Sequence, residues 1–177
     1  MTGPSFRVLI HHGEILRRTR ELAREIAASR RPYCLVAVME GARTFARALR
    51  GFLPGAPMVH ELRASSYGNG TTSSGSVKIL TGHDIPVESR DVLVIEDIVD
   101  TGRTVAALRE HLLASGARSV RVVTLLNKPS RRVVQVELHH VGFEIPDLFV
   151  LGYGMDLAGK YRDLPDIVVC ERTAAGN

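Results

Sequence analysis

The stretch DVLVIEDIVDTGRT, Asp91–Thr104, decides the fold. Val92–Ile95 is an apolar, β-branched run, which indicates a buried central strand. Two adjacent carboxylates, Glu96 and Asp97, end this run, and a predicted helix begins soon afterwards at Thr101. A buried strand that leads directly into a helix is typical of a parallel sheet with helices on its faces.

The turn between this strand and its helix is suited to hold a phosphate group. Free backbone N–H groups and the positive end of the helix dipole attract an anion there, and Gly102 allows its close approach. Glu96 and Asp97 would repel a phosphate by themselves, but they fit if they bind sugar hydroxyls or hold Mg²⁺ that bridges to phosphates. The complete pattern disfavours the alternative in which Asp100 only caps the helix and the other two carboxylates are surface charges.

Outward from this stretch, short β-branched runs alternate with helical patterns. Helical periodicity covers residues 14–28, 42–52 and 101–114, and strand-like runs cover residues 33–39, 57–63, 91–95, 119–126, 133–138, 148–152 and 167–170. The alternation predicts an α/β fold, in which a parallel-rich sheet is flanked by helices. Because ligands of such sheets bind beyond the carboxyl ends of the strands, the residues that follow each run are the candidate site residues.

Composition narrows the class of protein. The 177 residues fit one domain, and 23 basic against 19 acidic residues give a net charge of +4. No apolar stretch reaches the roughly 18 residues that cross a bilayer, and the N-terminus lacks a signal-peptide pattern. Cys34 and Cys170 each lie in an apolar run, so we expect buried, reduced thiols and a cytoplasmic protein. The mild basic excess suits a small anionic substrate better than nucleic acid, because aromatic residues are only 5%.

Residues 65–76, SSYGNGTTSSGS, differ in composition from the rest of the chain. They are rich in Gly, Ser and Thr, carry no formal charge and hold one aromatic residue, Tyr67. Such a segment buries too little apolar surface to offset the ordering of its backbone. We expect a mobile lid here, and a plain flexible hairpin loop is the alternative.

Other motifs of nucleotide or metal chemistry do not occur in the sequence. It contains no phosphate loop of the G-x-x-x-x-G-K-[ST] type, no dinucleotide fingerprint and no Cys/His spacing of a zinc site. These absences argue against hydride transfer and against P-loop hydrolysis.

Two long motifs together resemble one enzyme family. VLVIEDIVDTGRT, residues 92–104, resembles the phosphoribosyl-pyrophosphate (PRPP) motif of type I phosphoribosyltransferases. VGFEIPDLFVLGYGMDLAGKYRDLPDI, residues 141–167, resembles hypoxanthine-guanine phosphoribosyltransferases. With LLNK at 125–128 and SSY at 65–67, the resemblance extends from about residue 7 to residue 169.

The resemblance implies a fold and an activity. The implied fold is a single phosphoribosyltransferase domain over residues 1–177, with its core at about residues 30–145, a small hood from the N- and C-terminal segments and the lid at 65–76. The implied activity is purine salvage: Mg²⁺-dependent transfer of the 5-phosphoribosyl group from PRPP to N9 of hypoxanthine or guanine, giving IMP or GMP and pyrophosphate. A homodimer or homotetramer is the assembly that the family implies.

Three alternatives to this activity stay open. The enzyme could prefer xanthine, or it could use a pyrimidine base. The chain could also be a regulator on the same fold that senses PRPP or binds RNA, which the sequence pI of about 9.4 permits.

The family's PRPP-binding residues carry over to positions of this sequence. The implied PRPP site consists of Gly41, Ser66, Tyr67, Glu96, Asp97, Thr101, Gly102, Arg103, Thr104 and Arg162. By this resemblance, residues 101–104 cradle the 5′-phosphate, Arg162 contacts the pyrophosphate, and Ser66 and Tyr67 belong to the lid. Glu96 and Asp97 bind the ribose hydroxyls and, together with Asp156, are the implied magnesium residues.

The purine site carries over in the same way. Asp100 matches the general base that meets N7 of the purine, and Lys128 matches the lysine that binds the exocyclic oxygen at C6. Because a lysine only donates hydrogen bonds, it favours 6-oxopurines over adenine. Phe149 would stack on the base, although core packing is an equal alternative, and Val150 and Asp156 complete the set.

One position departs from the family pattern. The family has a basic residue just before the glycine of its pyrophosphate loop, and this chain has Glu40 there, in MEGAR. We expect Glu40 to pair with Arg43 or Arg162, so that the backbone N–H groups at Gly41 still bind pyrophosphate.

Overall fold

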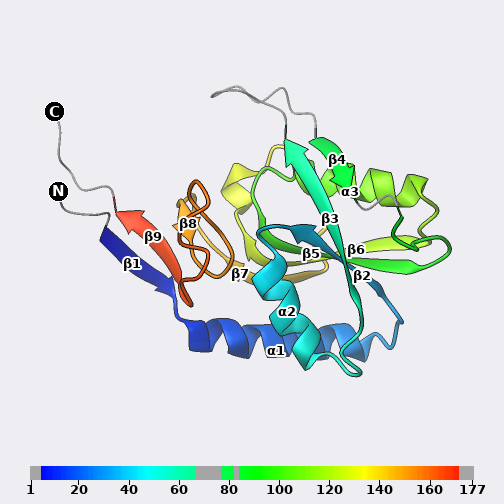
Figure 1. The fold of residues 1–177 in the computed structure, drawn as a ribbon, viewed down its shortest axis with the longest axis horizontal. Helices are drawn as coiled ribbons and strands as arrows, with labels where there is room; N and C mark the ends of the chain where they lie inside the picture. The colour runs from blue at the N-terminus through cyan, green and yellow to red at the C-terminus, as the bar shows by residue number, and fades with distance from the viewer. Residues whose placement is uncertain (1–4, 67–76, 82–83, 172–177) are drawn as a thin grey trace.

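The central apolar run forms the middle of a six-stranded sheet. The computed structural model describes residues 5–66, 77–81 and 84–171, and its main sheet has the strand order β4-β3-β2-β5-β6-β7 (Figure 1). The strands are β2 (Cys34–Met39), β3 (Val59–Ser66), β4 (Val77–Thr81), β5 (Asp91–Val99), β6 (Ser119–Asn127) and β7 (His140–Glu144). All neighbours pair in parallel except β3 and β4, so the predicted parallel-rich sheet is confirmed.

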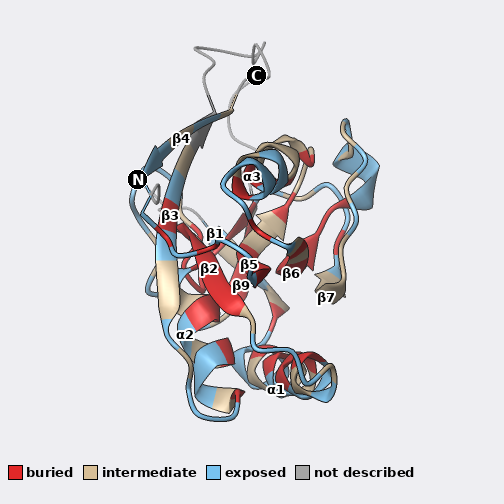
Figure 2. Ribbon diagram, turned by 90° about the vertical axis from the view of Figure 1, so that its right-hand side faces the viewer, coloured by how far each residue is buried: buried red, intermediate tan, exposed pale blue. Residues whose placement is uncertain are grey.

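Helices cover both faces of this sheet. They are α1 (His12–Ala28), α2 (Arg43–Phe52) and α3 (Arg103–Ala114), with a short 3-10 helix η1 (Pro129–Arg131). α1 and α2 pack on one face and α3 packs on the other (Figure 1). In β5, Leu93 and Ile95 face α1 and α2, whereas Val92 and Val94 face α3. Both faces of the strand are therefore buried, which explains its continuous apolar sequence (Figure 2).

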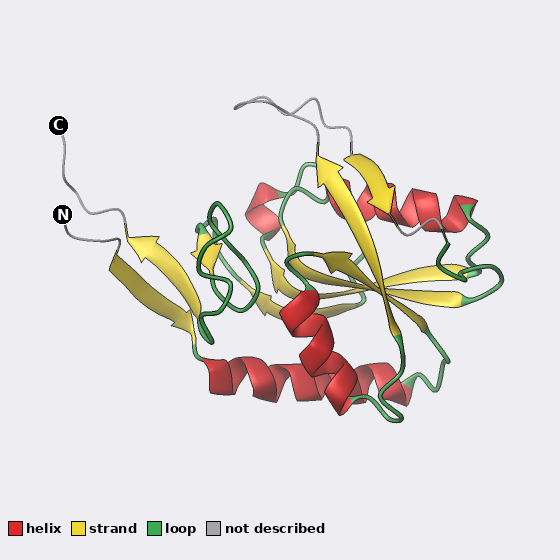
Figure 3. Cartoon of the chain, in the orientation of Figure 1, coloured by secondary structure: helices red, strands yellow, loops and turns green. Residues whose placement is uncertain are grey.

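A second, antiparallel sheet lies at one end of the main sheet (Figure 3). Its order is β1-β9-β8, with β1 (Ser5–Ile10), β9 (Ile167–Glu171) and β8 (Val150–Leu151). The apolar runs at 148–152 and 167–170 thus contribute strands to this small sheet and not to the parallel one. Segments from both ends of the described chain meet here, in the part of the chain where the resemblance implies a hood.

One predicted strand is wrong. Residues 133–138 form no strand, and β7 begins only at His140. Val133 is 60% exposed, and the N–H groups of Val133 and Val134 both donate to Thr101 O at 3.0 Å. The backbone of this segment is bonded to the turn before α3, so it is not free to join a sheet, despite its β-branched residues.

Two further observations bear on the sequence expectations. Within the described residues, no helix combines the length and the apolar character needed to cross a membrane. Cys34 and Cys170 are both free thiols, but only Cys34 is fully buried, so the expectation of buried thiols holds for Cys34 alone.

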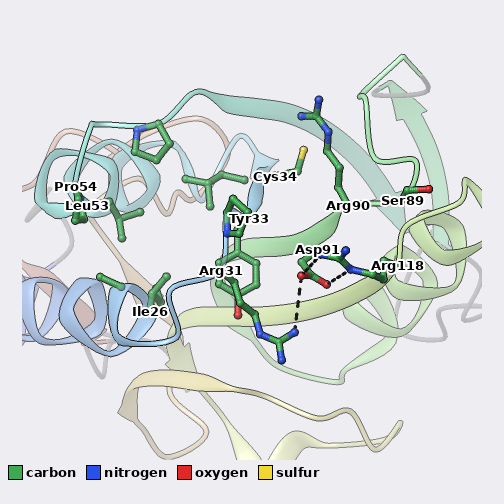
Figure 4. Close-up of a pocket in the computed structure, with 14 residues that line it drawn as sticks. Ile26, Arg31, Tyr33, Cys34, Leu53, Pro54, Ser89, Arg90, Asp91 and Arg118 are labelled. Atoms are coloured by element: carbon green, nitrogen blue, oxygen red, sulfur yellow. Dashed lines mark hydrogen bonds and ion pairs between the residues drawn. The ribbon is translucent and has the colours of Figure 1, made fainter.

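An ion cluster joins the amino ends of the central strands (Figure 4). Asp91, the buried first residue of β5, accepts hydrogen bonds from Arg118 Nε at 3.1 Å and from Ser119 Oγ at 2.5 Å. Arg31, in the connection from α1 to β2, lies 3.8 Å from the same carboxylate. The hydrogen bonds from Arg118 and Ser119 hold the pKa of Asp91 well below its usual range. The cluster therefore ties three segments together with a charge that must stay ionised.

The substitution Asp91→Asn tests this cluster through its pH dependence. Because the pKa of Asp91 is depressed in the folded state, its stabilisation is present above the ordinary pKa of 3.8 and is lost as pH falls through the folded value. We expect the variant to have a lower Tm than the wild type at neutral pH, and the difference to shrink below about pH 4. Thermal unfolding at a series of pH values measures this, with the exposed Asp84→Asn as the control. A difference that does not change with pH would contradict the role of the charge.

Candidate active site

The carboxyl ends of β2, β5 and β6 meet at one edge of the parallel sheet, and a cavity of about 370 Å³ lies there. It is lined by Glu40, Gly41, Asp97, Ile98, Asp100, Lys128, Phe149, Val150, Met155, Asp156 and Arg162. A larger cavity of about 620 Å³, at the amino ends of the strands, contains none of the candidate residues. Polar residues from four separate segments therefore lie together at the edge where ligands of parallel sheets bind.

The remaining candidates are not among the residues that line this cavity, and one of them lies outside the described residues. Glu96 is buried in β5, and Thr101–Thr104 form the turn that leads into α3 together with its first residues. Ser66 is the last residue of β3. Tyr67 and the rest of the expected lid, residues 67–76, lie outside the described residues.

Gly41 is required by a close approach to Asp97. A Cβ atom at position 41 would lie 1.9 Å from Asp97 Oδ2, so no larger residue fits while the carboxylate stays in place. The Ile98 N–H donates to the other carboxylate oxygen, Asp97 Oδ1, at 2.9 Å. The loop after β2 and the end of β5 are therefore packed against each other through this carboxylate.

Glu96 and Asp97 carry the most unfavourable charges of the site. Glu96 is 6% exposed, and its Oε2 has no hydrogen-bond partner among the described residues. Burial, and then the charge of Asp97, raise the pKa of Glu96 well above its usual value. Burial also raises the pKa of Asp97 to about 6. For Asp97, burial thus outweighs the partial compensation that the charge of Arg162 supplies.

Asp97 and Asp156 could hold a magnesium ion that is shared with a substrate. Successive strand residues point to opposite faces, so Glu96 and Asp97 are poorly placed to chelate one ion together. Asp97 and Asp156 both line the cavity, and the charge of Asp156 acts on Asp97. The described residues contain no group of three His, Cys, Asp or Glu side chains able to hold a metal. One or two carboxylates completed by substrate oxygens is a normal binding mode of Mg²⁺.

Arginines pair with the acidic side chains on both sides of the cavity. Arg43 lies 3.0 Å from Glu40, which confirms one of the two expected pairings. Arg63, which lies in β3 opposite Met39 at the end of β2, is 2.6 Å from the other oxygen of Glu40, a pairing that the sequence did not predict. Arg162 pairs instead with Asp156, at 2.8 Å. Glu40 is thus held by two cations and does not leave a free negative charge at the loop.

Lys128 and Phe149 both line the cavity, one buried and one exposed. Lys128 is only 6% exposed and lines the cavity, so it is not an ordinary surface lysine at a strand end. Phe149 lines the same cavity and is 56% exposed, which rules out the core-packing alternative. A buried cation and an exposed aromatic ring at one cavity are suited to bind a flat, polar ligand.

The turn before α3 has the tight geometry that a phosphate site needs. Gly102 has φ of 84°, a left-handed conformation that favours glycine, and a Cβ atom there would lie 2.3 Å from Val134 O. α3 begins at the next residue, so its first N–H groups lack partners within the helix.

Sequence reasoning missed Arg131, whose Nε lies 3.2 Å from Asp100 Oδ1, because the two residues are far apart in the chain.

The substitution Asp97→Asn tests the cost of this buried charge. The folded pKa of Asp97 lies above its ordinary value of 3.8, so its ionised form destabilises the fold at pH above about 6. We expect Asp97→Asn to be more stable than the wild type at pH 8, without magnesium, on the order of 1–3 kcal/mol. The gain should vanish below about pH 4, where both side chains are neutral. Urea unfolding at both pH values measures this, and a variant less stable than the wild type at pH 8 would contradict it.

Known proteins share this sequence and this fold. Residues 9–158 match the model of the phosphoribosyl transferase domain family. The chain is 42% identical to the hypoxanthine-guanine phosphoribosyltransferase of Bacillus subtilis, over 92% of either protein. A crystal structure of a hypoxanthine-guanine phosphoribosyltransferase from Bacillus anthracis matches with a TM-score of 0.87 and 36% identity, covering 93% of this chain and 98% of that one.

A longer relative contains a segment that is similar to this chain. The bifunctional protein TilS/HprT of Listeria innocua is 45% identical over 91% of this chain, which spans only 25% of that protein. The agreement in sequence over the whole described core, together with the agreement in fold, assigns the family. The chain belongs to the hypoxanthine-guanine phosphoribosyltransferase family of phosphoribosyl transferase domains.

Proposed function

We propose that this chain transfers the 5-phosphoribosyl group from PRPP to N9 of a 6-oxopurine, hypoxanthine or guanine, and yields IMP or GMP and pyrophosphate. The observation that carries the proposal is the cavity at the carboxyl edge of the sheet. It places a candidate proton acceptor, Asp100, beside a buried lysine, an exposed aromatic ring and the Asp156–Arg162 pair. Family membership supports the same reaction.

The purine half of the site is the part near Lys128. Lys128 would donate a hydrogen bond to the oxygen at C6, and Phe149 would stack on the ring. Asp100 would accept the purine proton at N7 as N9 attacks C1′ of PRPP. The bond between C1′ and the pyrophosphate oxygen breaks in the same displacement, so the pyrophosphate leaves with the electron pair.

The PRPP half lies nearer to α2 and α3. The N–H groups at the start of α3 would bind the 5′-phosphate, and Arg162 would bind the pyrophosphate as negative charge develops on it. Asp97 and Asp156 would hold Mg²⁺, which supplies positive charge to the leaving pyrophosphate. Glu96, whose Oε2 is buried without a hydrogen-bond partner among the described residues, would bind the ribose hydroxyls.

We also propose a cytoplasmic location and a homo-oligomeric state. The two free thiols of the chain suit a reducing compartment. The absence of any membrane-spanning helix among the described residues is consistent with this location.

A panel of bases tests the proposed reaction. The purified protein is mixed with Mg²⁺, PRPP and each of hypoxanthine, guanine, xanthine, adenine and uracil, and nucleotide formation is measured. We expect turnover with hypoxanthine or guanine and none with adenine, because Lys128 only donates hydrogen bonds. Turnover with adenine would contradict the role of Lys128. Binding of PRPP without turnover of any base would favour the PRPP-sensing regulator.

A further inference from the structure

The segment that follows Lys128 is hydrogen-bonded to the turn before α3. Lys128 N donates to Val99 O at 3.0 Å, and the N–H groups of Val133 and Val134 donate to Thr101 O. Two connections from neighbouring strands, β5 and β6, are thereby fixed side by side. The short helix η1 lies between these bonds, and its last residue is Arg131.

Arg131 reaches two carboxylates, Asp100 of the proposed purine site and Asp147. Its Nε lies 3.2 Å from Asp100 Oδ1 and 3.7 Å from Asp147 Oδ1. Asp147 belongs to the segment that carries Phe149. The guanidinium group therefore connects the three segments that bear the proposed proton acceptor, the proposed C6 lysine and the stacking ring.

We propose that Arg131 is a positioning residue for Asp100. By binding Oδ1, it fixes the orientation of the carboxylate and leaves Oδ2 to accept the purine proton. Among the described residues, Oδ1 accepts a hydrogen bond from the guanidinium, whereas no hydrogen bond reaches Oδ2. This inference rests on the proposed function, because it assigns Arg131 a part in the proposed proton transfer.

The exposure of the pair argues for positioning and against a structural role. The side chain of Arg131 is 49% exposed and that of Asp100 is 38% exposed. Ion pairs at this exposure contribute little to stability, since solvent screens them. Their geometric effect remains, because a short carboxylate without a fixed partner samples several rotamers and spends less time facing the substrate.

The substitution Arg131→Gln tests the proposal by steady-state kinetics with hypoxanthine. We expect kcat to fall about tenfold, part of the roughly 10²–10⁴-fold contribution of a well-placed proton acceptor. The KM for PRPP should change less than about twofold, because Arg131 does not contact the proposed PRPP half. Arg131→Lys, which keeps a cation near Oδ1, should recover most of the lost kcat.

A matched control separates positioning from stability. Arg109, on α3, forms a comparable half-exposed pair with Glu137 at 3.9 Å, away from the cavity. Arg109→Gln and Arg131→Gln should shift the Tm by similar small amounts, but only Arg131→Gln should lower kcat. An equal loss of kcat in both variants would overturn the proposal.

A double-mutant cycle tests whether Arg131 acts through Asp100. When Asp100→Asn has already removed the proton acceptor, adding Arg131→Gln should cause little further loss of kcat. Losses that multiply in the double variant would overturn the proposal, and so would an unchanged kcat in Arg131→Gln alone. Both of these results need an active wild type and leave the proposed function standing, whereas an inactive wild type would overturn the proposed function and this inference together.

Discussion

The burial of two adjacent carboxylates at the end of the central strand is the constraint on which the rest of the site depends. β5 is covered on both faces, so Glu96 is buried and Asp97 is half-buried at the cavity, and the pKa values of both rise because burial disfavours the charged form. The fold itself does not require charges there, and a chain with two apolar residues at these positions would be more stable. Such a cost is typical of functional sites, where it is offset when a ligand binds. The absence of a side chain at Gly41 and the position of Arg162 are arranged around this charge.

Much of the architecture could be predicted from the sequence, because a parallel sheet has simple requirements. Continuous apolar runs marked the strands that are buried on both faces, and helical periodicity marked α1, α2 and α3 closely. The prediction failed where backbone bonding overrides composition. The segment 133–138 has the residues of a strand but is bonded to the turn at Thr101. The end of β5 was predicted at Ile95 but lies at Val99, because carboxylates normally end a strand and here they continue it.

The candidate site was predictable to the extent that it follows the strand ends. The carboxyl ends of β2, β5 and β6 and the residues that follow them lie at one edge for a topological reason, so Gly41, Asp97, Asp100 and Lys128 could be expected to meet. The pairings among side chains could not be predicted in the same way. Arg63 and Arg131 reach their carboxylates from other segments, and only the strand order and the path of the connections bring them there. The exposure of Phe149 excluded core packing, an alternative that sequence alone left open.

The buried and only partly compensated carboxylate of Asp97 is the proposed binding group for PRPP and its magnesium ion. The most direct measurement compares the Tm of the wild type and of Asp97→Asn with Mg²⁺, with PRPP, and with both together. We expect the Tm of the wild type to rise most when Mg²⁺ and PRPP are both present, because the ion and the substrate neutralise the site jointly. Without ligands, Asp97→Asn should have a higher Tm than the wild type. When both ligands are added, its Tm should rise much less. An equal gain in the two proteins would contradict the claim, since the charge at position 97 would then play no part in binding.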